Sequence, residues 1–208
     1  MLIFDIGANV GEWARANSTE SSRIVSVEAS PITFEKLKSN VNGNENIIPL
    51  LYAVSPTDSS HVSFFHCHRA HTLSSLNKDW LSASYSRFES YKDSIEEIKV
   101  PAIRLDKLIE IYGQPNLIKI DVEGAEHIVI KSLTQKVPNL CFEWASEWKD
   151  QNAEVIRYLV SIGFSKFAIQ YEDSYKYRPA SYPLSSEQVI DVLARTTPKL
   201  EWGMVWAM

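Results

Sequence analysis

Short apolar runs alternate with segments of helical periodicity along most of this 208-residue chain. Runs that are rich in β-branched residues predict strands. Apolar residues that recur every three or four positions predict amphipathic helices between those strands. The expected strands are 2–6, 24–29, 46–55, 61–65, 116–121, 139–144, 164–171 and 200–208, with one more at the start of 98–113.

Capping signals set the helix boundaries. Ser30 is an expected N-cap with Pro31 at the first helical position, and Ser185 is an expected N-cap near the C-terminus. The alternation predicts an α/β fold with a doubly wound, mostly parallel sheet and helices on both faces. Because the chain finishes on two strands with one helix between them, the last strand is expected to insert antiparallel. The expected helices are 11–17, 30–41, 124–133, 151–162 and 186–195, with a further one that ends at Gly113.

The periodic pattern weakens between residues 55 and 94, which are rich in Ser, His and aromatic residues. A long irregular region in a compact domain is typical of functional loops or lids. Aromatic and basic residues recur at helical spacing within 85–92, so we expect part of this lid to contact an acceptor or a second copy of the chain. No repeat or linker divides residues 1–208, which predicts a single domain.

Composition limits the classes of partner and compartment. The formal net charge is −5, which weighs against DNA or RNA as the main partner. Two cysteines, Cys67 and Cys141, are too few for a disulfide framework and favour a reducing compartment. The N-terminus lacks a signal-peptide pattern, and no stretch approaches the roughly 18 apolar residues of a membrane span. These features predict a cytoplasmic protein.

The segment "DIGANVG" (5–11) follows the first expected strand, at the edge where open α/β sheets bind ligands. Gly7 and Gly11 would let the backbone approach a ligand closely. A Walker loop needs Lys and then Ser or Thr after its second glycine, but Glu12 and Trp13 follow here. A dinucleotide fingerprint needs glycines at positions 9 and 12, where the chain has Asn9 and Glu12. The loop therefore favours an adenosine compound without phosphates.

Two acids fit such a ligand. Glu28 ends the second expected strand, where a carboxylate can accept hydrogen bonds from both ribose hydroxyls. Asp5 ends the first strand and suits an ammonium or a water-mediated contact. A ligand that carries a ribose, a sulfonium and an amino-acid head is S-adenosylmethionine.

Three further acids crowd the end of a strand in "LIKIDVEGAEHIVIKSL" (117–133). The acid at position 126 can be explained by its contribution to helix stability, because an acid in the first helical turn interacts favourably with the helix dipole. Asp121 and Glu123 are explained less well in this way, since they lie before the helix at the ligand-binding edge.

These segments resemble a known family. "FDIGANVGEWA", "VEASPITFEKLKSN" and above all "IKIDVEGAE" are similar to FkbM-type S-adenosylmethionine-dependent methyltransferases, as are "HTLSSL", "IRLDKLIE" and "PNLCFEW". The resemblance covers residues 2–165 and implies a seven-stranded, Rossmann-like methyltransferase sheet and methyl transfer to oxygen. Family members usually carry a segment before the first strand. Residues 1–208 are therefore expected to be either a whole protein or the methyltransferase module of a larger one.

The resemblance also implies roles for individual residues. The loop after the first strand would hold the methionine half of the cofactor, Glu28 its ribose, and the end of the third strand its adenine. The implied cofactor-binding set is Asp5, Gly7, Ala8, Asn9, Gly11, Glu28, Ala29, Tyr52, Ala53 and Val54.

A sugar hydroxyl acceptor needs a base or a metal to lose its proton at neutral pH. Asp121 is the expected nearest group, and Glu123, Glu143 and His71 are the other catalytic candidates. Asp121 and Glu143 are also candidate ligands for Mg²⁺ or Mn²⁺, which prefer oxygen. Nearby, Trp144 and Trp148 are either core residues or faces that stack on a sugar ring.

The leading hypothesis is O-methylation of a sugar, a glycan or a glycosylated small molecule. A methyltransferase for protein or nucleic-acid nitrogen is less favoured, because no Asn-Pro-Pro-Tyr-type motif follows the strand where "IDVEGAE" stands. A non-catalytic binding subunit is a further alternative, against which the intact acid and glycine set counts. A dehydrogenase is remote because of Asn9 and Glu12.

Overall fold

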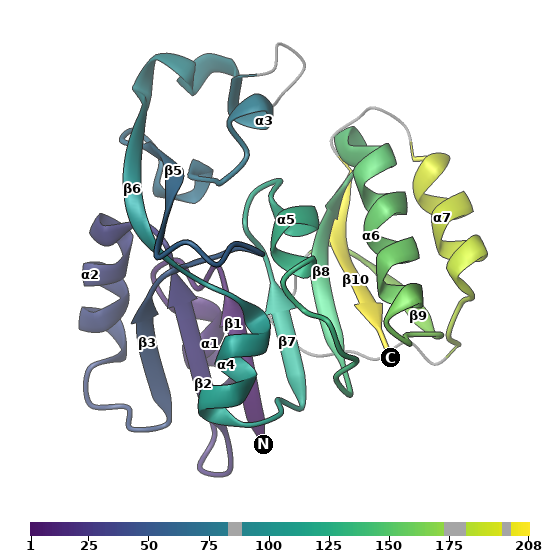
Figure 1. The fold of residues 1–208 in the computed structure, drawn as a ribbon, viewed down its shortest axis with the longest axis horizontal. Coiled ribbons are helices and arrows are strands. Elements are labelled where there is room, and N and C mark those ends of the chain that lie inside the picture. Colours follow the sequence, from purple (N-terminus) through teal and green to yellow (C-terminus); the bar gives the residue numbers. More distant parts are fainter. Residues whose placement is uncertain (83–88, 173–181, 197–200) are drawn as a thin grey trace.

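The computed structural model describes residues 1–82, 89–172, 182–196 and 201–208. Its main element is a seven-stranded sheet in the order β3-β2-β1-β7-β8-β10-β9 (Figure 1). This order reverses between β1 and β7, as in other doubly wound sheets. The strands are β1 (Leu2–Ile6), β2 (Arg23–Glu28), β3 (Ile47–Leu51), β7 (Leu117–Ile120), β8 (Leu140–Ala145), β9 (Phe167–Tyr171) and β10 (Trp202–Ala207).

Strand directions confirm the predicted topology. The pairings of β1 with β2 and β7, of β2 with β3, and of β7 with β8 are all parallel. The last strand, β10, runs antiparallel between β8 and β9. The expected strand 46–55 divides into β3 and the two-residue β4 (Ala53–Val54), and β3 forms a sheet edge, as Pro49 indicated.

Helices cover both faces of the sheet. On one face, α1 (Glu12–Asn17) and α2 (Pro31–Val41) contribute buried apolar residues such as Trp13 and Leu37 to a shared core. The opposite core receives residues from four later helices, which gives the layered arrangement of Figure 1. These are α4 (Leu105–Tyr112), α5 (Glu126–Ile130), α6 (Lys149–Ser161) and α7 (Ser186–Ala194).

Capping side chains explain the starts of two helices. Ser30 caps α2 by accepting the Thr33 N–H, and Ser185 forms a capping box with Gln188 at α7. The expected helix 124–133 is shorter in the structure, where α5 spans only Glu126–Ile130. Its first residues turn instead, because Glu123 and Gly124 have left-handed backbone angles (φ 54° and 82°).

Residues 55–94, expected to be irregular, contain a strand of a second sheet. That sheet has the order β4-β6-β5, with β5 (His61–Cys67) antiparallel to β6 (Ile95–Ile103). Sequence analysis recognised the start of β5 but not this pairing, because it joins segments about 30 residues apart. Figure 1 shows the second sheet beyond the carboxyl ends of β1 and β2. The remaining short elements are η1 (His71–Leu73), α3 (Lys78–Ser82) and η2 (Glu89–Ser94).

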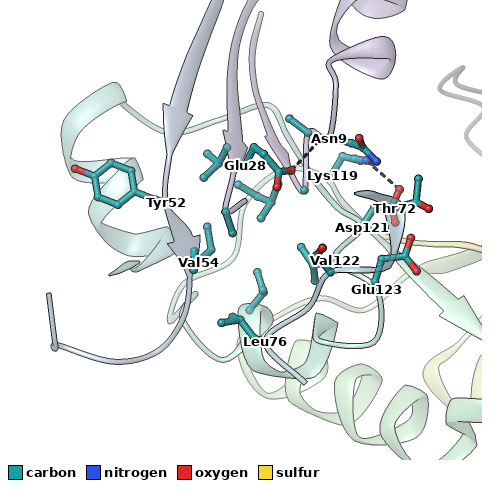
Figure 2. Close-up of a pocket in the computed structure, with 18 of the residues that line it drawn as sticks. Asn9, Glu28, Tyr52, Val54, Thr72, Leu76, Lys119, Asp121, Val122 and Glu123 are labelled. Atoms are coloured by element: carbon teal, nitrogen blue, oxygen red, sulfur yellow. Dashed lines mark hydrogen bonds and ion pairs between the residues drawn. The ribbon is translucent and has the colours of Figure 1, made fainter. Parts of the chain in front are cut away.

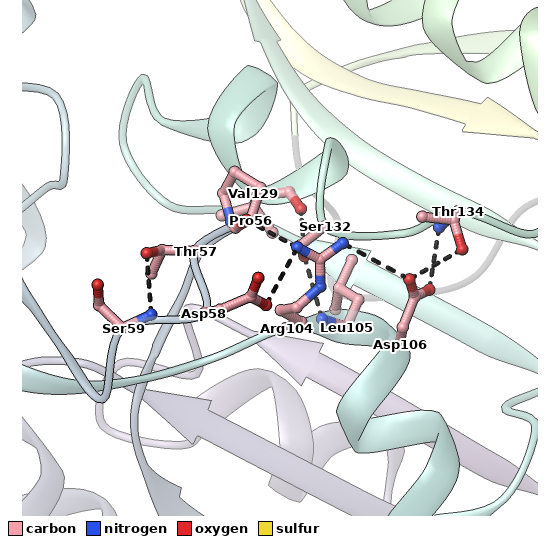
Figure 3. A network of polar contacts seen from close by, with 10 residues as sticks. All are labelled: Pro56, Thr57, Asp58, Ser59, Arg104, Leu105, Asp106, Val129, Ser132 and Thr134. Atoms are coloured by element: carbon pink, nitrogen blue, oxygen red, sulfur yellow. Dashed lines mark hydrogen bonds and ion pairs between the residues drawn. The ribbon is translucent and has the colours of Figure 1, made fainter.

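A polar network joins the chain that follows β4 and β6 of the second sheet to α4 and α5 (Figure 3). Arg104 Nη1, just after β6, donates to the Pro56 carbonyl at 2.7 Å. Next in the chain, Asp106 accepts hydrogen bonds from the backbone N–H and the hydroxyl of Thr134, both at 2.9 Å. The network therefore fixes the chain that leaves β4 against the end of α5.

Two predictions concern surfaces. Most of the aromatic segment expected within 85–92 lies outside the described residues, so its contact with an acceptor or a second copy stays a prediction. Within the described ranges, no helix combines the length and the apolar character needed to cross a membrane.

Candidate functional site

A cavity opens at the carboxyl ends of β1, β2 and β7, where the strand order reverses. It holds about 1030 Å³ of open space, part of it continuous with solvent. In Figure 2, Glu28 lies between an end bordered by Tyr52 and Val54 and an end bordered by Lys119 and Asp121. The cavity therefore offers an apolar end, a central carboxylate and a charged end.

The loop after β1 forms the floor of this cavity. The backbone N–H groups of Gly7 and Ala8 both donate to the Val27 carbonyl, at 2.9 and 3.0 Å, which turns the loop sharply toward β2. A Cβ added at Gly7 would lie 1.8 Å from the Asp121 carbonyl oxygen, and one at Gly11 would lie 2.7 Å from Leu37 Cδ1. These glycines, whose φ is positive, admit neighbouring parts of the chain. Their expected role in close approach to a ligand stays a prediction.

Glu28 is held at the centre of the cavity wall. Its Oε1 accepts the Ser30 N–H at 2.8 Å and its Oε2 accepts the Asn9 N–H at 3.0 Å. Burial raises the pKa of Glu28 to about 7, with a further contribution from the nearby Asp5 and with the backbone hydrogen bonds opposing. Each oxygen of an ionised carboxylate retains acceptor capacity beyond one backbone hydrogen bond. Glu28 is therefore a preformed acceptor for two hydroxyl donors.

Lys119 is a functional candidate that the sequence reasoning missed. Its side chain is 5% exposed, and its Nζ lies 3.4 Å from Asp5 Oδ1 and 3.1 Å from Asp121 Oδ2. Nζ also lies 5.9 Å from the centroid of the Trp13 ring, within cation–π range. Burial lowers the pKa of Lys119, but the charges of Asp121 and Asp5 outweigh it, so the net pKa is raised and the ammonium stays charged. The sequence feature that could have identified Lys119 is its place inside the otherwise apolar strand "LIKI".

The loop after β7 carries the acids of the second motif. Asp121 and Glu123 line the cavity, and the Asp121 side chain is 31% exposed. Glu126 has a different place: it is buried and its Oε1 accepts the Val122 N–H at 2.9 Å. Burial raises the pKa of Glu126. Glu126 therefore makes a structural contact within the loop, while the interaction with the helix dipole that its sequence position favoured stays a prediction.

The outer wall comes from the region expected to act as a lid. Thr72, Ser74 and Leu76 line the cavity, and the Ser75 hydroxyl donates to the Val122 carbonyl at 3.3 Å. "HTLSSL" indicated this loop through the family resemblance, but His71 was its one residue predicted at the site, and Thr72, Ser74 and Leu76 were not. Phe64 of β5 completes the wall near Val54 and Ala29.

Three predicted site residues do not line the cavity. Asp5 is fully buried and ion-paired with Lys119. Gly11 packs against α2, as described above. Glu143 is 6% exposed within β8, where it pairs with Met204. The remaining predicted cofactor residues, together with Asp121 and Glu123, do lie on the wall: Gly7, Ala8, Asn9, Glu28, Ala29, Tyr52, Ala53 and Val54.

Other predictions have mixed outcomes. His71 belongs to η1, but its side chain lies outside the described part of the structure. No group of three His, Cys, Asp or Glu side chains suited to a metal ion occurs among the described residues, so the Mg²⁺ or Mn²⁺ prediction remains untested. Trp144 is a core residue with 0% exposure, and its Nε1 donates to the Gln170 carbonyl at 3.2 Å.

The comparison with protein families shows to which family the chain belongs. The model of the methyltransferase FkbM domain matches residues 5–174. The chain belongs to the FkbM methyltransferase family.

Curated and solved proteins agree with this membership of the FkbM family. The chain is 28% identical over 144 residues to the hexuronic acid methyltransferase AglP of Haloferax volcanii, a match that covers 68% of this chain and 53% of AglP. The FkbM chain therefore spans about half the length of this curated relative.

Two solved fibrillarins share the fold. The Methanococcus jannaschii protein has a TM-score of 0.52 at 14% identity, covering 100% of this chain and 65% of that one. The Aeropyrum pernix protein, solved with natively bound S-adenosyl-L-methionine, has a TM-score of 0.50 at 12% identity, with the same coverage of 100% and 65%. At these identities the likeness establishes the Rossmann-like methyltransferase fold of the FkbM domain and nothing about its substrate.

Proposed function

We propose that this FkbM domain transfers a methyl group from S-adenosylmethionine to a hydroxyl oxygen of a sugar, in a glycan or a glycosylated small molecule. The observation that carries the proposal is the order of groups along one cavity: an apolar end at Val54, the Glu28 carboxylate, and then Lys119 with Asp121. The same order, adenine, ribose and charged methionine, runs along S-adenosylmethionine.

The residues present suit each part of that molecule. One end of the cavity is bordered by the apolar and aromatic side chains of Tyr52, Val54 and Phe64, which suit an adenine ring. Glu28 has acceptor capacity for the two ribose hydroxyls. Asn9, Lys119 and Asp121 surround the end where an amino-acid head, with its ammonium and carboxylate, would lie.

S-adenosylmethionine supplies a methyl group that its sulfonium makes susceptible to in-line displacement. The chain's contribution is alignment of the acceptor oxygen and removal of its proton. Asp121 is our candidate for the proton acceptor, because it lines the cavity and remains partly exposed. Lys119 holds one oxygen of Asp121 at 3.1 Å and so restricts the orientation of the carboxylate. We assign Glu143 and His71 no direct step.

A sugar acceptor is favoured by the similarity to AglP, whose name specifies a hexuronic acid as its substrate. A hexuronic acid contains two kinds of acceptor oxygen, hydroxyl and carboxylate. A carboxylate is already ionised at neutral pH and needs no base, whereas a hydroxyl does. Methylation of a carboxylate is therefore the second candidate, and the two products differ chemically, since a methyl ester is hydrolysed by mild alkali and a methyl ether is not.

The test combines binding with product analysis. Calorimetry should detect S-adenosylmethionine binding, and thermal melting should show stabilisation by the ligand. Incubation with methyl-labelled cofactor and a panel of neutral sugars, hexuronic acids and glycosides, with and without chelator, should then label a sugar in an alkali-stable form. Absence of cofactor binding at millimolar concentration would overturn the proposal, and alkali-labile label would replace the hydroxyl acceptor with the carboxylate.

A further inference from the structure

A second cavity lies beyond the carboxyl end of β8 and is here called the Trp80–Trp148 cleft. Its walls include Asn77 and Trp80 around the start of α3, His127 of α5, and Glu147 with Trp148 of η3 (Ser146–Trp148). None of these five residues lines the cofactor cavity. The two tryptophan rings meet edge to face, with centroids 5.1 Å apart and an interplanar angle of 80°.

The cleft is attached directly to the acid loop of the cofactor cavity. Asn77 Nδ2 donates to the Gly124 carbonyl at 2.8 Å, and Asn77 Oδ1 accepts the Trp80 N–H at 3.1 Å. The Trp80 ring lies so close to Gly124 that an added Cβ would be 2.5 Å from Trp80 Cδ1. Residues 121–124 thus lie between the two cavities, with Asp121 and Glu123 on the cofactor side. A molecule held in the cleft is therefore next to the charged end of the cofactor cavity.

Two buried polar atoms of the cleft residues are unsatisfied within the described part of the structure. Trp148 Nε1 and His127 Nδ1 are both buried, and neither has a hydrogen bond among the described residues. The whole Trp148 side chain is deeply buried, with the residue 5% exposed. A buried donor left unpaired costs about 1–3 kcal/mol, so such groups in native proteins call for an explanation. A hydrogen bond to a bound ligand would explain both atoms, because Trp148 and His127 line the cleft.

The chemistry of the two atoms selects the ligand class. An indole N–H only donates, so Trp148 needs an oxygen acceptor. Burial lowers the pKa of His127, although Glu154 opposes this, which favours the neutral ring with one donor and one acceptor nitrogen. Hydroxyl groups both donate and accept. A ring with several hydroxyls also has C–H groups, which suit the faces of aromatic rings such as those of Trp80 and Trp148.

We propose that the Trp80–Trp148 cleft binds the sugar ring of the methyl acceptor, with hydroxyl groups of that ring hydrogen-bonded to Trp148 Nε1 and His127 Nδ1. The proposal rests on the proposed function, which it deepens by assigning the acceptor to named residues. Asn77 and Trp80 act as positioning residues, because they join the cleft to the loop that carries Asp121.

The test uses Trp148→Phe and His127→Phe, which keep an aromatic ring and remove the polar atom. Each should raise the KM for the acceptor sugar by about three- to tenfold, the value of one lost hydrogen bond. The Kd for S-adenosylmethionine, measured by calorimetry, should not change. The melting temperature should fall by no more than a few degrees. Arg157→Ala, in a separate hollow between α6 and α7, is the matched control and should leave all three quantities unchanged.

The outcomes separate the cleft from the proposed function. If the wild-type chain methylates a sugar and both variants keep the wild-type KM, the cleft assignment is wrong while the function stands. If no sugar is methylated, the function fails, and binding of methyl glucoside and glucuronic acid is measured directly by ligand-observed NMR. Binding that Trp148→Phe weakens would retain the cleft as a sugar site, whereas an absence of binding to the wild type would overturn it.

Discussion

Lys119 and Asp121 stand two residues apart in the chain, and the Lys119 Nζ lies 3.1 Å from the Asp121 Oδ2. The same ammonium lies 3.4 Å from the Asp5 Oδ1, so one buried cation joins the ends of two adjacent parallel strands. A charge buried to this degree is tolerated only when it is paired. The pairing explains how Asp5, buried behind the cavity, and Asp121, on its wall, can lie close to the same cation.

Replacing Lys119 should therefore reduce the stability of the fold, apart from any effect on methyl transfer. Lys119→Met leaves the Asp5 carboxylate buried without its ion pair and should lower the free energy of unfolding by about 3–5 kcal/mol in urea titrations. The double variant Asp5→Asn/Lys119→Met should recover much of that loss, because it removes both charges. If the double variant also regained full methyl transfer, Lys119 would have no part in orienting Asp121.

The binding of S-adenosylmethionine should weaken as the pH falls. Because the pKa of Glu28 is raised to about 7, the carboxyl takes up a proton below that pH and loses acceptor capacity for the ribose hydroxyls. At pH 6 roughly one carboxyl in ten is ionised, so calorimetry should show affinity about tenfold lower than at pH 8. Glu28→Gln should bind weakly and lose this dependence, while any titration of the ligand itself persists in the variant. An unchanged pH profile would remove Glu28 from the binding site.

The same shift predicts the pH dependence of stability without ligand. In the unfolded chain Glu28 ionises near pH 4.5, whereas in the folded protein it keeps its proton up to about pH 7. Between these values the folded state binds more protons, so stability falls as the pH rises through this window, by on the order of 3 kcal/mol from this group. The raised pKa of Glu126 acts in the same direction. Urea titrations at pH 5 and pH 8 should show a smaller difference for Glu28→Gln than for the wild type.

Asp121→Asn should separate binding from chemistry. The amide keeps the shape of the side chain but no longer accepts a proton, so kcat should fall by about 10²–10⁴-fold while the Kd for S-adenosylmethionine stays within a few-fold. Glu143→Gln is the matched control, because Glu143 is buried in β8 and does not line the cavity. Wild-type kcat in Asp121→Asn would indicate an acceptor that needs no base, such as a carboxylate.

Gly7→Ala tests the contact between the two motif loops. The added Cβ would meet the Asp121 carbonyl at 1.8 Å, so the loop after β7 must move and both stability and activity should be largely lost. Gly43→Ala has a similar φ of 82° but meets no atom within 4 Å, so it should cost about 1 kcal/mol and leave activity intact. Equal effects of the two substitutions would show that backbone strain, rather than the contact with Asp121, decides the outcome.

Local patterns were sufficient for much of this fold. Strands such as β1 and β2 are short runs rich in Ile, Val and other apolar residues. Capping residues such as Ser185 fix helix ends through contacts within three or four residues. The second sheet was not recognisable in the same way, since the pairing of β5 with β6 depends on contacts across the intervening chain. Propensity does not report such contacts.

The cavity shows the same division between local and distant information. Glu28 and Asn9 could be placed because each lies at the end of a recognisable strand or in its loop. Lys119 could not, because its position at the site follows from burial next to two carboxylates, one of them 114 residues earlier in the chain. Trp148 was left open between core and site for a similar reason, and only the tertiary arrangement separates it from the core residue Trp144.

The antiparallel insertion of β10 has a consequence for the order in which the domain is assembled during synthesis. Every strand that borders the cofactor cavity, together with the loop after β7, is contained in residues 1–130, which leave the ribosome first. β8, which leads into the Trp80–Trp148 cleft, has β7 on one side but lacks its other neighbour until residues 202–207 have been made. A nascent chain can therefore complete the walls of the cofactor cavity before β8, which leads into the proposed acceptor cleft, is paired on both sides. β8 remains an open sheet edge throughout that interval.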